Sequence, residues 1–181
     1  MFACSRRFAL ALPLLAATSA WAAGDADNTA VLTTKHGKVT IELHPEWAPK
    51  TVAQFKTLVK DKFYDGLKFH RVIPGFMAQT GDPTGTGGGG SKLPNVPGEF
   101  NQTHFKRGIL GMARTDDPNS GNSQFFIMFG DAASLDGKYT AFGEVTSGMD
   151  AVDKIKAGTE SNNGAVDNPD KIVTLRMAGA K

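Results

Sequence analysis

Polar and apolar residues follow two different periods in the first part of the chain. Residues 38–43 alternate, with an apolar side chain at every second position, as in a strand with one buried face. Pro49 then fits the first turn of a helix, where its missing N–H has no partner to lose. The apolar residues after it recur at helical spacing and predict an amphipathic helix with one buried face: Val52, Phe55, Leu58 and Val59.

The rest of the chain consists of short apolar runs separated by turn residues. Residues 149–155 predict a second helix, 81–98 a long ordered loop and 23–28 a flexible start. Further strands are predicted at 31–34, 69–73, 109–112, 124–129, 142–145 and 172–177. About eight strands and two helices predict a mainly β fold, an eight-stranded antiparallel closed barrel whose ends are capped by the two α-helices.

The first 22 residues have the pattern of an export signal. Arg6 and Arg7 precede an apolar stretch from Phe8 to Ala17 that is too short to span a bilayer, and Ala20-Trp21-Ala22 has the form of a cleavage site. We expect a signal peptide at 1–22, cleaved after Ala22, and one domain at 23–181 in the periplasm. The arginine pair leaves a twin-arginine route open beside the ordinary secretory one.

Composition excludes several classes of function for the mature chain. Removal of Arg6 and Arg7 lowers the twenty basic residues to eighteen, equal to the number of acidic ones, so no basic surface for nucleic acid is expected. No later segment has the length of a membrane helix. The single cysteine, Cys4, lies in the signal, so no disulfide is expected and a packed core must hold the domain together.

The candidate chemistry lies in the run from Phe69 to Gln79. Alternation in an extended segment places Arg71 on one face with Phe69 and Ile73, and His70 on the other. A Pro-Gly turn then returns Phe76, Met77 and Gln79 toward Arg71. A fixed donor beside an apolar hollow suits a site that holds an apolar group and changes its conformation. A stacked or salt-bridged structural arginine is the alternative on this run alone.

Two other patterns suggest sites, and both fail on their context. Residues 85–90 match G-x-G-x-x-G, but prolines at 83 and 94 exclude the helix that a dinucleotide site needs. The four histidines are scattered without metal-ligand spacing, so no metal site is expected: His36, His44, His70 and His104.

Three further stretches add to the Arg71 run: Gly108–Thr115, Asn122–Ile127 and Leu135–Tyr139. Together the four motifs resemble the cyclophilin family of peptidyl-prolyl cis/trans isomerases, over residues 31–177. The export signal and the triplet at 113–115 resemble the bacterial exported branch of that family.

The resemblance implies a role for each matching position. Arg71 matches the catalytic arginine, and Gly85 matches a loop contact. Tyr139 stands where many members have histidine, and Ser134 where many have tryptophan, so only weak binding of cyclosporin is expected. The remaining substrate-binding positions comprise the proline pocket (Phe76, Met77, Phe126, Leu135), the polar groups beside it (Gln79, Gln124) and the segment that pairs with the residue before proline (Ala113, Arg114, Thr115).

The resemblance therefore implies an isomerase that accelerates X-Pro bond rotation in exported proteins as they fold. Its expected partners are proline-containing unfolded or partly folded polypeptides, and a monomer without cofactor or metal is expected. Two alternatives remain at this stage: a peptide-binding folding chaperone with incidental isomerase activity, and a barrel that binds a small apolar ligand in its lumen.

Overall fold

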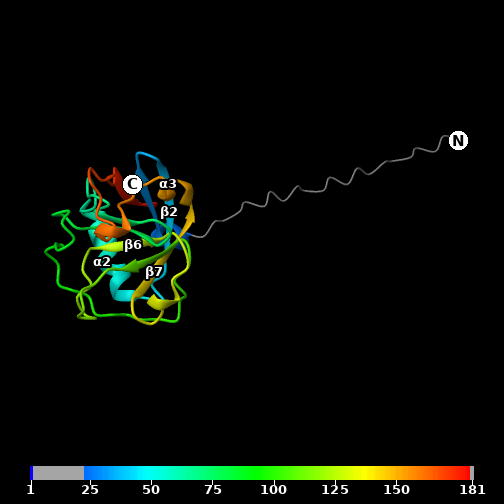
Figure 1. Cartoon of the computed structure of the whole chain (residues 1–181). Coiled ribbons are helices and arrows are strands. Elements are labelled where there is room, and N and C mark those ends of the chain that lie inside the picture. The colour runs from blue at the N-terminus through cyan, green and yellow to red at the C-terminus, as the bar shows by residue number, and fades with distance from the viewer. Residues whose placement is uncertain (2–22, 180–181) are drawn as a thin grey trace.

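The structure, a computed structural model, describes Met1 and residues 23–179 (Figure 1). Three α-helices are present in these residues: α1 (Ala23–Asn28), α2 (Pro49–Lys60) and α3 (Met149–Asp153). Two short 3₁₀ helices, η1 (Ala133–Leu135) and η2 (Glu160–Asn162), lie in loops. The strands are β1 (Thr29–Thr34), β2 (Gly37–Leu43), β3 (Arg71–Ile73), β4 (Met77–Thr80), β5 (Ile109–Met112), β6 (Phe125–Met128), β7 (Thr140–Ser147) and β8 (Thr174–Met177).

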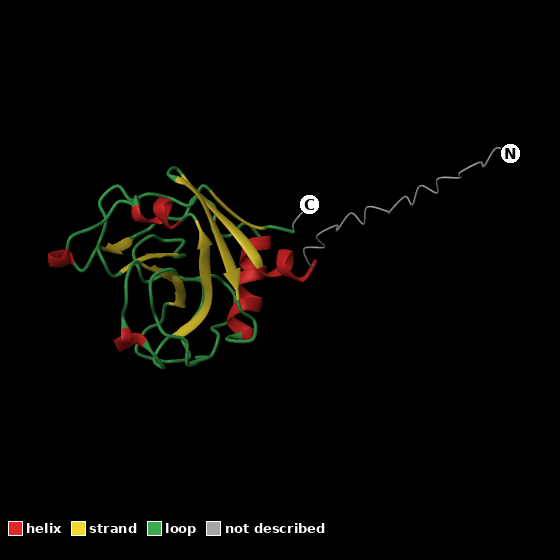
Figure 2. Ribbon diagram, turned by 90° about the vertical axis from the view of Figure 1, so that its right-hand side faces the viewer, coloured by secondary structure: helices red, strands yellow, loops and turns green. Residues whose placement is uncertain are grey.

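All eight strands form one antiparallel sheet in the order β3-β4-β6-β5-β7-β2-β1-β8. The sheet curls into a half-barrel, and Figure 2 shows its strands curving around the interior. Strands β3 and β8 are its two edges and do not pair with each other. The closed barrel expected from the sequence is therefore not confirmed, although the mainly β antiparallel fold is.

A loop covers the edge of β3 and explains why the ladder stays open there. The backbone N–H of Val72 donates to the carbonyl of Gly164 at 2.8 Å, and the N–H of Gly158 donates to the carbonyl of Val72 at 3.0 Å. Three residues before Val72, the N–H of Phe69 donates to the carbonyl of Asp170 at 2.9 Å. Irregular chain thus satisfies the backbone groups that a neighbouring strand would otherwise bond.

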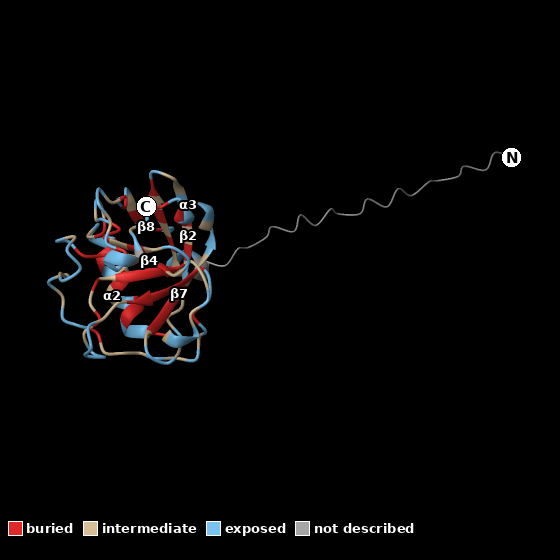
Figure 3. Ribbon diagram, in the orientation of Figure 1, coloured by how far each residue is buried: buried red, intermediate tan, exposed pale blue. Residues whose placement is uncertain are grey.

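The interior of the curled sheet is filled by aromatic side chains. Phe55 of α2 lies 5.3 Å from the ring of Phe125 and 5.2 Å from that of Phe142, centroid to centroid, and all three are fully buried. Helix α2 packs near β7 and β8 through its predicted apolar face. Figure 3 shows that the labelled strand β4 is largely buried, and β7 is buried over its first half, Thr140–Gly143. Within the described residues, these packed rings occupy the interior that the lumen-binding alternative needs to be hollow.

A second, smaller apolar cluster lies apart from the main core. It contains residues from β4, β5, β6 and β7 together with Phe105: Met77, Ile109, Phe126, Met128 and Ala141. Several of the predicted pocket residues are only partly buried and pack on its outer side, namely Phe76, Leu135 and Tyr139. The cluster therefore supports a surface hollow from beneath.

Three local expectations differ from the structure. Residues 23–28 form α1 rather than a flexible start. Phe69 lies in the main core with Val72, on the opposite side from Arg71, because β3 begins only at Arg71 and the strand alternation does not extend back to Phe69. Helix α3 ends at Asp153, before the predicted limit. Within the described residues, no helix has the length and apolar character needed to cross a membrane.

Candidate active site

The β3–β4 hairpin places Arg71 directly beside Gln79. The two residues are cross-strand partners, and the turn between them has Gly75 at a φ of +72°, a conformation that glycine adopts without strain. Nη1 of Arg71 donates to Oε1 of Gln79 at 3.2 Å. The return of the chain toward Arg71, expected from the Pro-Gly turn, is thus confirmed.

The other side of the guanidinium is held by Asn163, a residue that the sequence reasoning did not identify. Nε of Arg71 donates to the backbone carbonyl of Asn163 at 3.0 Å, and Nη2 donates to its Oδ1 at 2.9 Å. Asn163 has a positive φ of 56°, which asparagine tolerates better than most residues. Asn163 lies in a loop, and nothing in its sequence indicates that it bonds to Arg71.

The guanidinium is therefore fixed but not fully engaged. Three of its five N–H groups bond within the described chain, and two remain for a further acceptor. Arg71 is half-buried, and this burial lowers the pKa of its guanidinium, which still carries its charge at neutral pH. Arg71 is thus a hydrogen-bond donor held in a fixed position, with N–H groups available to an acceptor of the substrate.

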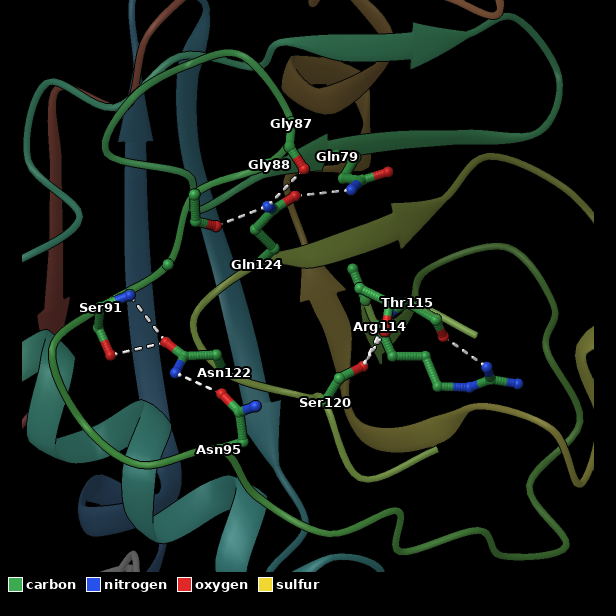
Figure 4. Close-up of a pocket in the computed structure, with 13 residues that line it drawn as sticks. Gln79, Gly87, Gly88, Ser91, Asn95, Arg114, Thr115, Ser120, Asn122 and Gln124 are labelled. Carbon is green, nitrogen blue, oxygen red and sulfur yellow. Dashed lines mark hydrogen bonds between the residues drawn. The ribbon is translucent and has the colours of Figure 1, made fainter. Parts of the chain in front are cut away.

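Two glutamines continue the network away from Arg71. Nε2 of Gln79 donates to Oε1 of Gln124 at 2.8 Å, and Nε2 of Gln124 donates to the carbonyls of Gly87 and Gly89 at 2.9 and 2.8 Å (Figure 4). Each amide donates at one end and accepts at the other. The orientation of Gln79 is therefore set by its neighbours, and its oxygen points to Arg71.

Arg71 lies at a cavity of about 170 Å³ that contains nine of the predicted site residues. Phe126, almost fully buried in the second apolar cluster, is part of its wall and packs edge-on against Tyr139 at 5.8 Å between ring centroids. The cavity has apolar walls and one charged donor. Its lining residues are Arg71, Phe76, Met77, Gln79, Ala113, Arg114, Phe126, Leu135 and Tyr139.

Arg114 forms the rim between this cavity and the next. Its guanidinium lies 4.7 Å from the ring centroid of Tyr139, and Nε and Nη2 donate to the carbonyl of Lys138 at 3.1 and 3.0 Å. The tyrosine thus provides a flat surface for the arginine. These contacts hold Arg114 at the surface beside the pocket.

A larger cavity of about 370 Å³ adjoins the first and shares Gln79, Ala113 and Arg114 with it. Figure 4 shows the glycine loop and Gln124 on one side of this cavity, and Arg114 and Thr115 on the other. Two neighbouring cavities joined by a shared wall suit an extended chain that occupies both.

One predicted contact lies elsewhere. Gly85 lines neither cavity, and a side chain placed on it would point at Lys68, with Cδ only 2.8 Å away. The glycines that line the larger cavity are those at 87–90. The other eleven predicted site residues all line one cavity or the other.

Asp82 anchors the glycine loop from below. It is 1% exposed and accepts hydrogen bonds from the hydroxyl and N–H of Thr84 and from the N–H of Thr86 and Gly87. Burial by itself would raise the pKa of this carboxyl. The hydrogen bonds from Thr84 and Gly87 outweigh that effect and lower the pKa to about 2.

Asp82→Asn is expected to destabilise the protein at pH 6 by about 2 kcal/mol. The folded protein donates hydrogen bonds to the ionised carboxylate, and the lowered pKa of Asp82 in the folded state means that ionisation stabilises the fold. This stabilisation is fully present above the unfolded pKa of about 3.9 and is lost as the pH falls toward 2. Urea unfolding of parent and variant between pH 6 and 2 measures the difference. Asp61→Asn, at an exposed position, is the control, and a difference that does not change with pH would contradict the assignment.

Most of the chain is similar to known peptidyl-prolyl cis-trans isomerases. A family model described as cyclophilin type peptidyl-prolyl cis-trans isomerase/CLD matches residues 29–177. A probable peptidyl-prolyl cis-trans isomerase of Brucella suis is 56% identical over 162 residues, which cover 83% of each chain. An isomerase of Schizosaccharomyces pombe is 49% identical over 122 residues, covering 65% of this chain and 78% of that protein.

Solved structures agree with these relatives. A cyclophilin from Hirschia baltica superposes with a TM-score of 0.76 at 33% identity, covering 84% of this chain and 74% of the other. A cyclophilin type isomerase of Cryptosporidium parvum, crystallised in the presence of the dipeptide Ala-Pro, gives 0.75 at 29% identity, covering 82% and 98%. The chain belongs to the cyclophilin family and is a peptidyl-prolyl cis-trans isomerase.

Proposed function

We propose that this isomerase accelerates X-Pro bond rotation in polypeptides that fold after export to the periplasm, with Arg71 as its catalytic residue. The observation that carries the catalytic assignment is the guanidinium at the apolar cavity, held by Gln79 and Asn163 with two N–H groups still available. No nucleophile is required, because no bond is broken in the reaction.

The chemistry follows from the electronic structure of the peptide bond. Resonance between the nitrogen lone pair and the carbonyl gives rotation a barrier of about 20 kcal/mol. In the twisted transition state that lone pair leaves conjugation and becomes a hydrogen-bond acceptor. A donor fixed in place for it stabilises the transition state more than either planar state, which is the condition for catalysis.

In this proposal the proline ring occupies the 170 Å³ cavity, against Phe126 and Met77. The residues before proline extend over the shared wall at Gln79 and Ala113 into the larger cavity. The solved Cryptosporidium relative crystallised with Ala-Pro supports a proline-containing ligand for this chain. The test is the cis-to-trans conversion of a short X-Pro peptide by the full-length protein.

A refolding assay on two protein clients, one with and one without proline, separates the isomerase from the peptide-binding chaperone. An isomerase shortens the slow, proline-limited refolding phase of a client and has no effect on a client without proline. A chaperone raises the yield of both clients equally. Equal effects on the two clients would overturn the proposal.

The export part of the proposal rests on residues 1–22, of which 2–22 lie outside the described residues. Their charged start, apolar stretch and Ala-Trp-Ala end support secretion. Expression of the whole chain in a Gram-negative host is expected to give a periplasmic protein that begins at Ala23, as N-terminal sequencing would detect. A cytoplasmic protein with an intact N-terminus would contradict it.

Phe126→Leu is expected to lower kcat/KM about fivefold, which corresponds to about 1 kcal/mol lost from ring-on-ring packing with the substrate proline. Leucine keeps most of the buried apolar volume, so the fold is retained. Because Phe126 lines only the cavity assigned to proline, the loss should be equal for peptides with different residues before proline. A loss that varies strongly with that residue would place Phe126 at another subsite.

A further inference from the structure

Outside the isomerase site, Glu42, His44 and Glu144 converge on one face of the sheet. Glu42 lies near the end of β2, and His44 directly follows that strand two residues later, so alternation brings both side chains to the same face. Glu144 of β7 is the cross-strand partner of Glu42. One possible ligand atom from each of the three lies within 4.8 Å of the other two.

The two carboxylates form an unfavourable pair when no cation is bound. Like charges directly opposite each other on neighbouring strands destabilise a sheet. No lysine or arginine among residues 23–179 forms an ion pair with Glu42 or Glu144. Glu144 instead faces His44, whose Nε2 lies 3.5 Å from its Oε1.

The imidazole of His44 is held with Nε2 directed at these carboxylates. Nδ1 lies 2.7 Å from Oε1 of Glu46, and the ring stacks on Trp47 with 3.7 Å between centroids and 15° between planes. A carboxylate accepts hydrogen bonds, so in the neutral ring Nδ1 carries the proton and Nε2 bears the lone pair. Nε2 is buried and has no hydrogen-bond partner.

The contact between Glu46 and Nδ1 is typical of metal-ligating histidines, whose second ring nitrogen donates to a carboxylate that fixes the tautomer and the ring orientation. Nε2 with its lone pair and the two carboxylates are all acceptors, so none of the three groups can donate a hydrogen bond to another. Ligands at about 2.0–2.2 Å from a tetrahedral zinc ion lie about 3.3–3.6 Å apart. The 3.5 Å between His44 Nε2 and Glu144 Oε1 matches such an edge, and the exposed Glu42 side chain can rotate to complete the set.

We propose that Glu42, His44 and Glu144 bind a divalent transition metal ion of the zinc class, with Glu46 as the positioning residue of His44. An imidazole ligand favours such ions over Mg²⁺ and Ca²⁺, which prefer oxygen ligands alone. Three protein ligands leave the fourth position to water. The site does not depend on the isomerase mechanism, since none of these residues lines either cavity described above.

Calorimetric titration of the chelator-treated full-length protein with Zn²⁺ tests the proposal. One binding site is expected. His44→Gln and Glu144→Gln should each lower the affinity at least about tenfold, and Glu46→Gln should lower it about 10–100-fold without changing the melting temperature of the metal-free protein. A large excess of Ca²⁺ should not displace Zn²⁺, and displacement would overturn the histidine-dependent assignment.

His104→Gln is the matched control. This histidine also lies between two carboxylates, but both ring nitrogens are already engaged, Nε2 by Asp131 at 2.9 Å and Nδ1 by Asp136 at 2.6 Å. Its replacement should leave Zn²⁺ affinity unchanged. An equal loss in His104→Gln, or full binding in His44→Gln, would show that zinc binds elsewhere and would overturn the proposal.

A melting experiment provides a second measurement that does not require the His44 variant to fold. Without metal, Glu42→Gln should melt no lower than the parent, because the substitution removes the repulsion between Glu42 and Glu144. With excess Zn²⁺ the parent should gain in melting temperature through binding to the folded state, and the variant should gain much less. Equal gains, or no gain in either protein, would contradict the site.

Discussion

Arg71→Ala is expected to lower kcat/KM for an X-Pro peptide about a hundredfold. In the proposed mechanism the guanidinium donates to the imide nitrogen only when rotation has freed its lone pair, so the lost hydrogen bond would belong to the transition state. Loss of one such charged donor costs about 3 kcal/mol. The variant should fold normally, because the Arg71 side chain lines a surface cavity and, among the residues that the structure describes, hydrogen-bonds to Gln79 and Asn163.

Two further substitutions make this experiment specific. Arg71→Lys should restore only part of the rate, since a lysine cannot donate to Gln79, to Asn163 and to the substrate at once. Arg107→Ala removes another arginine, whose Nη2 lies 2.6 Å from Oδ2 of Asp153. Arg107 lines neither of the two site cavities, so this substitution should leave kcat/KM unchanged. A folded Arg71→Ala protein with near-normal kcat/KM would falsify the mechanism.

The centre of the site was predictable because local sequence determines it. Arg71 and Gln79 are eight residues apart on either side of a Pro-Gly turn, and a two-stranded hairpin makes such residues neighbours. The strand periods likewise placed the core residues, since alternation and helical spacing depend only on which face is buried. The assignment of individual roles to Ala113, Thr115 or Leu135 required the family resemblance.

Contacts between distant segments were not predictable in this way. Asn163 reaches Arg71 across 92 residues of sequence, from a loop without a periodic pattern. The same loop covers the edge of β3, so counting strands could not distinguish a closed ladder from an open one. His44 and Glu144 meet only through the register between β2 and β7. The histidines looked scattered because sequence spacing does not give that register.

The second large effect is expected at Ser134, in the 3₁₀ helix beside the pocket. Ser134 is exposed and directly precedes Leu135, which lines the 170 Å³ cavity. Cyclosporin-type macrocycles bind the proline groove of cyclophilins, where an indole at this position supplies apolar area and an N–H donor. Serine supplies neither that area nor that reach. The parent should therefore bind cyclosporin weakly, with its isomerase activity intact.

Ser134→Trp should tighten cyclosporin binding by about 2 kcal/mol or more, roughly thirtyfold, because a tryptophan at the edge of a pocket is among the strongest single contributors to binding. Isomerase activity should change little, since the new side chain lies outside the proline cavity. Inhibition of X-Pro isomerisation measures the affinity, and Ser134→Leu separates the apolar contribution from the N–H.

Fluorescence gives an independent measurement of the same complex. Trp47 stacks on His44 and lines neither cavity, so cyclosporin should barely change the emission of the parent. The Ser134→Trp variant should respond, because its new indole would lie at the edge of the groove, in contact with the bound macrocycle. Tight inhibition of the parent, or no gain in the variant, would show either that residue 134 does not occupy the position of the family tryptophan or that the indole contributes little to binding.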